Sequence, residues 1–143
     1  MIMSGLSATD VRRNWSQFND DIVREGPQFV KRNRDEWVAM STEQLKVAFS
    51  NFTFHAHMVQ EENGSVTATL DQFDFVENGS SEKEVLEALT QELIEYAQEY
   101  MDNFKLYFHS PNRKAHFPYI LNVVAQDHPE NVRQLITCQA GVK

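Results

Sequence analysis

The chain of 143 residues has few of the features that mark specialised protein classes. It contains one cysteine, Cys138, so an internal disulfide is excluded and a reducing cytoplasm is expected. Its apolar runs extend over only a few residues, far below the roughly 18 that span a bilayer. The start of the chain lacks a basic segment followed by an apolar stretch, so we expect no secretory signal and no membrane partner.

Other absences narrow the function further. The sequence has no glycine-rich phosphate-binding loop, no internal repeat and no low-complexity tract. Hydrophobic residues make up 41% and charged residues 24% of the chain, an ordinary globular composition that argues against wholesale disorder. A chain of about 140 residues is long enough for one domain, or for two small domains that each have a thin core.

Charge is distributed unevenly along the chain, whose formal net charge is −8. Residues 1–49 contain seven basic and seven acidic side chains and are neutral, so residues 50–143 carry the whole −8. The basic side chains of the first part are concentrated in two short groups, Arg12-Arg13 and Lys31-Arg32-Arg34. Such groups are either solvated surface charge or local phosphate-binding sites.

The first fifty residues show alternating helix and strand signals. Apolar residues at helical spacing predict a helix from a cap at Ser7 or Thr9 to about Arg24. The apolar stripe consists of Val11, Trp15, Phe18 and Ile22. The other predicted elements are a short strand at 2–6, strands at 28–32 and 36–40 joined by a turn at 33–35, and a helix capped by Ser41 and Thr42.

The composition changes near Ser50, and the pattern after it indicates strands followed by helices. Asn63-Gly64 predicts a hairpin, because both residues tolerate the positive φ angles of a tight turn. Ser81 and Glu84 form a capping box before a long amphipathic helix. Strands are predicted at 52–59 and 66–70, with an irregular third strand at 71–77 and a turn at Asn78-Gly79. The helix has an apolar stripe of Val85, Leu86, Leu89, Leu93, Tyr96, Tyr100 and Phe104, and an acidic face of Glu82, Glu84, Glu87, Glu92, Glu95 and Glu99.

Several short helical signals follow Phe104. Residues 105–108 fit either a final strand or the end of the long helix. A helix start is predicted at Ser110-Pro111, with an interruption or restart at Pro118 and a continuation over 119–125. A further helix is predicted from 127–130 to about Ile136, and residues 138–143 are expected to be frayed.

Three segments of the first part resemble the Phd/YefM family of bacterial antitoxins. They are 7–16, which carries an Arg-x-Asn-apolar-Ser pattern, 29–34 and 37–41. The resemblance implies a small α/β unit that dimerises and binds operator DNA. It implies that Arg12 reaches a phosphate or base edge from the helix and that Arg32 contacts DNA from the strand, with Arg13, Lys31 and Arg34 as further candidates. Arginine offers a forked set of donors for phosphate or guanine, and a twofold dimer doubles every contact.

The second part resembles a different family, the HicB antitoxin domain. The segments that carry the resemblance are 54–59, the turn at 62–64, strand 66–70, the 71–77 stretch and the Ser81-capped helix with Glu87-Ala88-Leu89. HicB domains have a β-β-β-α-β order and resemble a trimmed RNase H fold, so the resemblance implies a second α+β unit. The helices after Ser110 lie outside the common HicB core.

Five histidines are candidate metal ligands. His55 and His57 lie two apart in a predicted strand and therefore point to one face, where His109, His116 or His128 could join them at a metal. No cysteine or acid stands at a compatible local spacing. Surface or partly buried histidines are therefore the preferred interpretation, and no metal or cofactor is expected.

Catalytic chemistry is the least favoured interpretation. Asp71 and Asp74, with Glu61 or Glu62, could mimic the carboxylates of a two-metal nuclease. The further acids that such a site needs on separate elements are not identifiable, and a turn rich in acids is usually solvated. Cys138 has no activating pattern around it and is expected to be inert.

The acidic face of the long helix has two interpretations. It is either a solvated face beside a packed stripe or an electrostatic patch for a basic partner. Toxins that cleave RNA are often basic because they hold phosphates, so an acidic antitoxin domain would steer toward such a toxin and compete with its RNA.

These signals predict a two-part α+β protein. Residues 1–50 are expected to form a Phd/YefM-like dimerisation and DNA-binding domain, and residues 52–143 an acidic HicB-like domain with extra C-terminal helices. The predicted function is a type II antitoxin that represses its own operon and neutralises a partner toxin, without being an enzyme. Its partners would be operator DNA, a basic RNA-cleaving toxin and further copies of itself, as a homodimer or higher oligomer. The alternative is a dimeric adaptor that binds a protein partner and not DNA.

Overall fold

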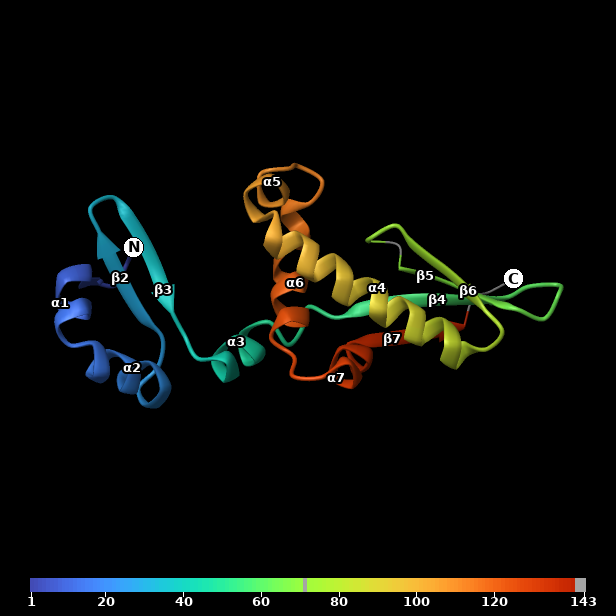
Figure 1. The fold of residues 1–143 in the computed structure, drawn as a ribbon, viewed down its shortest axis with the longest axis horizontal. Helices are drawn as coiled ribbons and strands as arrows, with labels where there is room; N and C mark the ends of the chain where they lie inside the picture. Colours follow the sequence, from blue (N-terminus) through green and yellow to red (C-terminus); the bar gives the residue numbers. More distant parts are fainter. Residues whose placement is uncertain (71, 141–143) are drawn as a thin grey trace. The chain divides into compact units, whose positions relative to one another are not determined.

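The computed structural model describes residues 1–70 and 72–140 (Figure 1). The chain divides into two compact units, Met1–Ala48 and Phe49–Lys143, which we call unit 1 and unit 2. The fold is α+β, and the described residues form two sheets, seven α-helices and one short 3-10 helix. None of these helices combines the length and the apolar character needed to span a membrane.

Unit 1 contains a three-stranded sheet, formed by β1 (Leu6–Ser7), β2 (Gln28–Arg32) and β3 (Asp35–Ala39) in that order. β1 is parallel to β2, and β3 is antiparallel to it. The turn between β2 and β3 places Asn33 at φ 55, a left-handed conformation that asparagine adopts more readily than most residues. The strand expected at 2–6 is wrong in extent, because only Leu6 and Ser7 pair with β2.

The single helix expected before Arg24 is divided into α1 (Ala8–Arg13) and α2 (Trp15–Arg24). Ser7 caps α1 as predicted, with its Oγ accepting from the Asp10 N–H at 3.1 Å. At Asn14 the backbone leaves the helical region, with φ −117 and ψ 45, and the Asn14 side chain donates to the Asp10 carbonyl at 3.2 Å. A side chain that bonds the nearby backbone competes with the helix, and this accounts for the break.

The last element of unit 1 is α3 (Thr42–Ala48). Ser41 and Gln44 bond each other reciprocally, backbone N–H to side-chain oxygen, at 3.0 and 3.1 Å. The Gln44 amide also donates to the Ile22 carbonyl at the end of α2, at 2.8 Å. The start of α3 is therefore held to α2 by one side chain.

Unit 1 has a very small core. Its fully buried apolar side chains are Val11, Phe18 and Val30. Ile22 packs against them as predicted, but Trp15 of the expected stripe is 60% exposed. Its ring stacks on Phe18 at 5.7 Å between ring centroids and leaves its outer face uncovered. Trp15 therefore belongs to the predicted apolar stripe but not to the buried core.

Unit 2 is built on a four-stranded sheet of order β6-β5-β4-β7. Its strands are β4 (Phe54–Gln60), β5 (Val66–Leu70), β6 (Phe75–Gly79) and β7 (Ile136–Ala140). β4, β5 and β6 form an antiparallel meander, with Gly64 at φ 86 in the predicted hairpin turn. The third strand begins later than predicted, after a turn in which Asp74 has φ 54, and Asn78-Gly79 belongs to β6 and not to a turn.

The final strand corrects the prediction for the C-terminal end of the chain. Residues 138–140 were expected to be frayed, but they belong to β7, which pairs in parallel with β4. Ile136 is buried opposite Phe54, and the Thr137 hydroxyl donates to the Phe54 carbonyl at 3.2 Å. Burial and pairing with a strand far away in the sequence hold this segment, whereas residues 141–143 lie outside the described residues.

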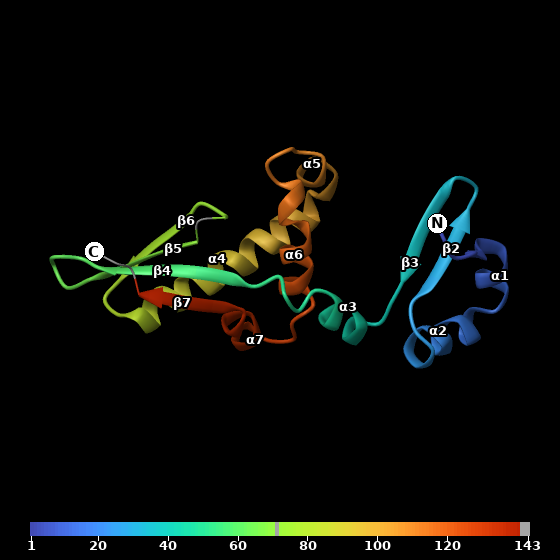
Figure 2. The same ribbon diagram turned by 180° about the vertical axis from the view of Figure 1, so that it is seen from behind.

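The helices of unit 2 are α4 (Glu82–Asp102), α5 (Phe104–Phe108), α6 (Phe117–Val124) and α7 (Pro129–Gln134). α4 packs against β5 and β6 and against α6 and α7, and Figures 1 and 2 show it crossing one side of the sheet. Residues 105–108 are helical, and the helix expected from Ser110 is a run of turns with a 3-10 helix at Lys114–His116. Pro118 lies in the first turn of α6 and does not interrupt it, because a proline there costs no internal hydrogen bond.

The core of unit 2 lies between the sheet and α4. Five positions of the predicted stripe on α4 are buried, namely Val85, Leu86, Leu89, Leu93 and Tyr100. The sheet supplies alternate positions, such as Phe54, Ala56 and Met58 on β4. Ser81 caps α4 as predicted, with its Oγ accepting from the Glu84 N–H at 3.2 Å.

Candidate functional site

The five predicted DNA-contacting side chains all belong to unit 1 and are all exposed. Arg12 and Arg13 occupy the last turn of α1, where a cation also complements the helix dipole. Lys31 and Arg32 end β2, and Arg34 lies in the turn before β3.

The register of β2 divides its two cations between the faces of the sheet. Val30 is buried against α1 and α2, so Arg32, two positions later, lies on the same side, while Lys31 lies on the opposite side. Each cation also stands opposite an acid on β3, with Lys31 paired to Glu36 and Arg32 to Asp35. Sequence reasoning missed this cross-strand arrangement, which lowers the local positive charge.

Unit 1 also exposes large apolar side chains close to its small core. Trp15 and Val23 on α2 are 60% and 68% exposed. Trp37 and Val38 on β3 are exposed on opposite sides of the sheet, because they are consecutive strand residues. A unit of this size with so little buried apolar surface is well suited to association with another surface.

The acidic face of α4 is only partly as predicted. Glu82, Glu84, Glu87, Glu95 and Glu99 are exposed, but Glu92 is half-buried. The Glu84 carboxylate accepts hydrogen bonds from the Ser80 hydroxyl and the Ser80 N–H, which lower its pKa. The exposed acids lie along α4 where another molecule can reach them.

Glu92 is half-buried on the side of α4 that lies next to Glu77 of β6. Burial raises the pKa of Glu92 to about 7, and the neighbouring carboxylates of Glu77 on β6 and of Glu95 add to the shift. Its Oε2 atom is buried without a hydrogen-bond partner among the described residues. Near neutral pH this carboxyl group therefore takes up a proton, which reduces its repulsion with Glu77.

An aromatic cluster surrounds His116 at one end of unit 2. Its Nε2 contacts the Gln72 carbonyl at 3.1 Å and its Nδ1 contacts the Tyr96 hydroxyl at 2.7 Å. The carbonyl can only accept, so Nε2 carries the proton and Nδ1 accepts from the tyrosine. Burial lowers the pKa of His116, which favours this neutral form. With both nitrogens engaged, His116 is a structural group and not a free base.

Arg113 completes the same cluster. Its guanidinium lies 4.3 Å from the centroid of the Tyr107 ring, and the Tyr107 hydroxyl donates to Glu99 at 2.5 Å. A pocket of about 420 Å³ opens beside these groups. Since its polar groups already bond or stack on one another, the arrangement can bind a polar group but shows no nucleophile paired with a base.

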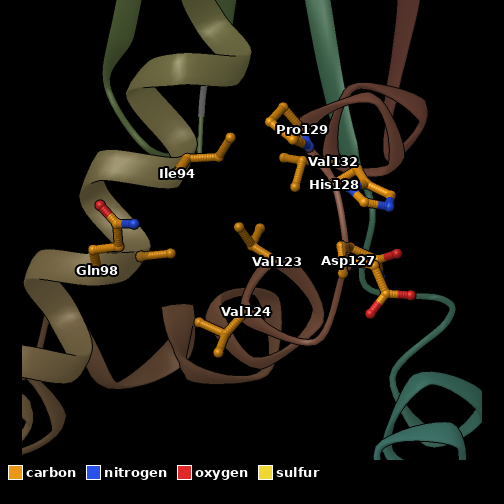
Figure 3. Close-up of a pocket in the computed structure, with 10 residues that line it drawn as sticks. Ile94, Gln98, Val123, Val124, Asp127, His128, Pro129 and Val132 are labelled. Atoms are coloured by element: carbon orange, nitrogen blue, oxygen red, sulfur yellow. The ribbon is translucent and has the colours of Figure 1, made fainter.

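A second pocket of unit 2, of about 290 Å³, lies between α4, α6 and α7 (Figure 3). Ile94, Val123 and Val132 give it apolar walls. Asp127 and His128 stand on one side of the opening. Its size and lining suit an apolar side chain of a partner.

The other chemical hypotheses find no support in the geometry. Within 1–70 and 72–140, no three histidine, cysteine, aspartate or glutamate side chains gather in a way that could hold a metal ion. The Nδ1 atom of His55 contacts the Thr137 hydroxyl at 2.7 Å, and His116 is engaged as described above. Asp71, one of the two proposed nuclease acids, lies outside the described residues, and Asp74 is in the turn before β6.

Comparisons with known proteins show what the chain is related to. Residues 1–138 match the PHD_like family, described as "Antitoxin of toxin-antitoxin, RelE / RelB, TA system". A crystal structure from Syntrophomonas wolfei subsp. wolfei, of the antitoxin part of a proposed toxin/antitoxin system, is 40% identical and has a TM-score of 0.93. The match covers 97% of this chain and 100% of that one. The search of curated proteins found no match. By the extent of the family match, the chain belongs to the PHD_like family of antitoxins.

Proposed function

We propose that this antitoxin represses its own operon by binding operator DNA through unit 1, and neutralises a partner toxin by direct contact with unit 2. The observation that carries the DNA-binding part is the exposure of all five basic side chains, Arg12, Arg13, Lys31, Arg32 and Arg34, on unit 1. The two units differ in charge, since unit 1 is neutral and unit 2 carries the net −8. DNA therefore meets less repulsion at unit 1 than at unit 2.

Dimerisation of unit 1 is part of the proposal. Its three buried apolar residues are a small core for an independent unit, and Trp15, Trp37 and Val38 leave apolar surface available to a second copy. The Phd/YefM-like pattern in 7–16, 29–34 and 37–41 supports the same arrangement. A twofold dimer would present two sets of arginines to DNA, and its affinity would fall steeply with salt.

Toxin binding is assigned to unit 2. The order β4-β5-β6-α4, with β7 closing the sheet, supports the HicB-like interpretation, with three further α-helices and one short 3-10 helix between α4 and β7. The exposed acids of α4 suit a basic RNA-cleaving toxin, which would be steered to them and kept from its RNA. The protein would act in the cytoplasm by occlusion, without a cofactor, a metal or catalytic residues.

The test of DNA binding is a titration of the purified protein against the DNA upstream of its own gene, across a salt series. We expect tight binding whose logarithm falls linearly with the logarithm of salt concentration. The double variant Arg12→Ala and Arg32→Ala should weaken binding by roughly a hundredfold or more, and lower the salt slope, because it removes two cations from each protomer.

The matched control is Arg24→Ala. Arg24 is an exposed cation of the same unit, at the end of α2, but it lies outside the proposed set. This variant should bind the DNA nearly as well as the wild type. An equal loss of DNA affinity in the two variants would show that only the overall charge matters. If the protein binds its upstream DNA no more strongly than random DNA at low salt, the repressor proposal for the protein alone is overturned.

One observation favours the alternative, a dimeric adaptor without DNA binding. Lys31 and Arg32 each stand opposite an acid on β3, so part of the positive charge is compensated. An adaptor would show no change in any DNA assay when Arg12 and Arg32 are replaced, while binding of its protein partner would persist in both variants.

A further inference from the structure

The outer edge of β7 is an unpaired sheet edge. Among the described residues, β7 has β4 as its only neighbour, and Figures 1 and 2 show it at the border of the sheet. The Phe54 N–H donates to the Leu135 carbonyl at 2.9 Å, so in a parallel ladder the odd-numbered positions 135, 137 and 139 face β4. The backbone N–H and C=O groups of Ile136 and Cys138 therefore point away from the sheet.

This edge lacks the features that usually prevent strands from pairing with another chain. Its residues Ile136, Thr137, Cys138 and Gln139 include no charge, proline or glycine. One outer carbonyl, that of Ile136, accepts from the Arg133 guanidinium at 3.3 Å, and the groups of Cys138 lie two residues beyond it. The opposite edge strand, β6, differs because it contains Glu77 and ends in Gly79.

Charge identifies the occupant of this edge. On the side away from α4, the four strands present only histidine, threonine, valine, asparagine and glutamine side chains at their paired positions. A basic toxin would be drawn to the acids of α4 and gains nothing electrostatic at β7. A second copy of unit 2 carries the same −8 and is repelled by the acids, so an uncharged surface such as β7 is where two copies of unit 2 can meet.

We propose that β7 pairs antiparallel with β7 of a second copy across a twofold axis, joining two four-stranded sheets into one. This interface is separate from the proposed dimer of unit 1, and it does not depend on DNA or toxin binding. When Ile136–Ala140 pairs along its whole length with the same segment of the second copy, Cys138 at its midpoint lies opposite Cys138 of that copy. The outward N–H and C=O of each Cys138 then bond the other, and the pair has a Cα separation of about 5.5 Å.

Cys138 supplies the test, because it is the single cysteine and its side chain is exposed. The intact chain is treated with a short bifunctional thiol reagent, and the covalent dimer is followed with time. Pairing raises the effective thiol concentration to the millimolar range, so cross-linking at micromolar protein should be roughly a hundredfold faster than by random encounter. Cys138→Ser should give no covalent dimer.

The matched control moves the thiol to the other edge strand. Val76 in the middle of β6 is 62% exposed, so Val76→Cys in a Cys138→Ser background has an accessible thiol at the charged edge. It should cross-link far more slowly than Cys138, at no more than the rate that tethering through a dimer of unit 1 gives. Equal rates for Cys138 and for this variant would overturn the proposal.

A second variant tests the edge itself. Gln139→Lys adds a charge to β7 without disturbing the buried Ile136, and it should reduce Cys138 cross-linking to the control rate. Gln91→Lys, which adds the same charge on the exposed side of α4, should leave the rate unchanged. A different result would overturn our assignment. Cys138 would then form no cross-link with itself, and it would be protected from a maleimide only when the toxin is co-expressed. This would show that the edge of β7 pairs with a strand of the toxin.

Discussion

The two units of this antitoxin differ most in how much of their stability is internal. Among the described residues, unit 2 buries a cluster of sixteen apolar residues between its sheet and its helices, whereas unit 1 buries three. Unit 1 is also the neutral part, and it exposes both tryptophans, Trp15 and Trp37. From this comparison we expect unit 2 to hold its own fold, and unit 1 to gain stability when another chain covers its apolar surface.

The largest expected effect comes from separating the units. Residues 49–143 alone should unfold cooperatively at a denaturant concentration that does not depend on protein concentration. Residues 1–48 alone should be folded only where they associate, because three buried side chains do not offset the conformational entropy of the chain. Circular dichroism of both fragments over a wide range of concentration measures the difference.

A folded monomer of residues 1–48 at low concentration would contradict this prediction. The control is the full chain, in which both tryptophans report on unit 1 alone. Their fluorescence should follow a transition that depends on concentration, while the helical signal should follow mainly unit 2.

A smaller effect should follow from a cavity in the core of unit 2. Leu93 is fully buried on α4, so Leu93→Ala should destabilise unit 2 by about 3 kcal/mol. The matched control is Val124→Ala on α6, which is 50% exposed and should cost much less. Urea unfolding followed by circular dichroism should shift, while the tryptophan signal of unit 1 stays in place. A shift of both signals together would show that the units unfold as one.

The smallest effect is a dependence of unit 2 on pH. The pKa of Glu92 is about 7 in the folded chain and 4.5 without its surroundings, mainly because of burial. Below the lower value the group is protonated in both states. As pH rises between the two values only the unfolded chain ionises, so stability is lost, and above the higher value the loss is complete.

The measurement is urea unfolding of wild type and Glu92→Gln at several pH values between about 5 and 8. Relative to the variant, the wild type should lose about 1 kcal/mol, after allowance for solvent screening. Glu87→Gln, an exposed acid on α4 that does not contribute to the Glu92 shift, should follow the wild type. A constant difference between wild type and Glu92→Gln across the range would show that Glu92 has an ordinary pKa.

Local signals predicted much of this fold. Ser7 and Ser81 are helix caps, Gly64 forms a hairpin turn, and the stripe from Val85 to Tyr100 is buried. Each of these depends on residues near one another in the sequence. β7 was missed because Thr137 and its neighbours become a strand only by pairing with β4, which no local pattern records.

The candidate site was also predicted only in part, for the same reason. The basic residues were found from their types and order, but their register was not, so the acids opposite Lys31 and Arg32 came only from the structure. Glu92 was placed on the solvated face because helical spacing cannot separate it from Glu95 without knowing where β6 lies. The roles of Arg12 and Arg32 at DNA stay predictions.

The pairing of β4 with β7 also determines when the sheet of unit 2 can form during translation. His55 and Thr137 are in contact across the sheet although they are 82 positions apart in the sequence. The strand β4 can therefore pair with β7 only after β7 has been synthesised. At roughly 5–20 residues per second, translation delivers β7 several seconds after β4, while unit 1 has already emerged. An antitoxin built in this way closes the sheet of unit 2 only after β7 has been translated, and any chain that stops before β7 leaves the ribosome with an open edge on β4.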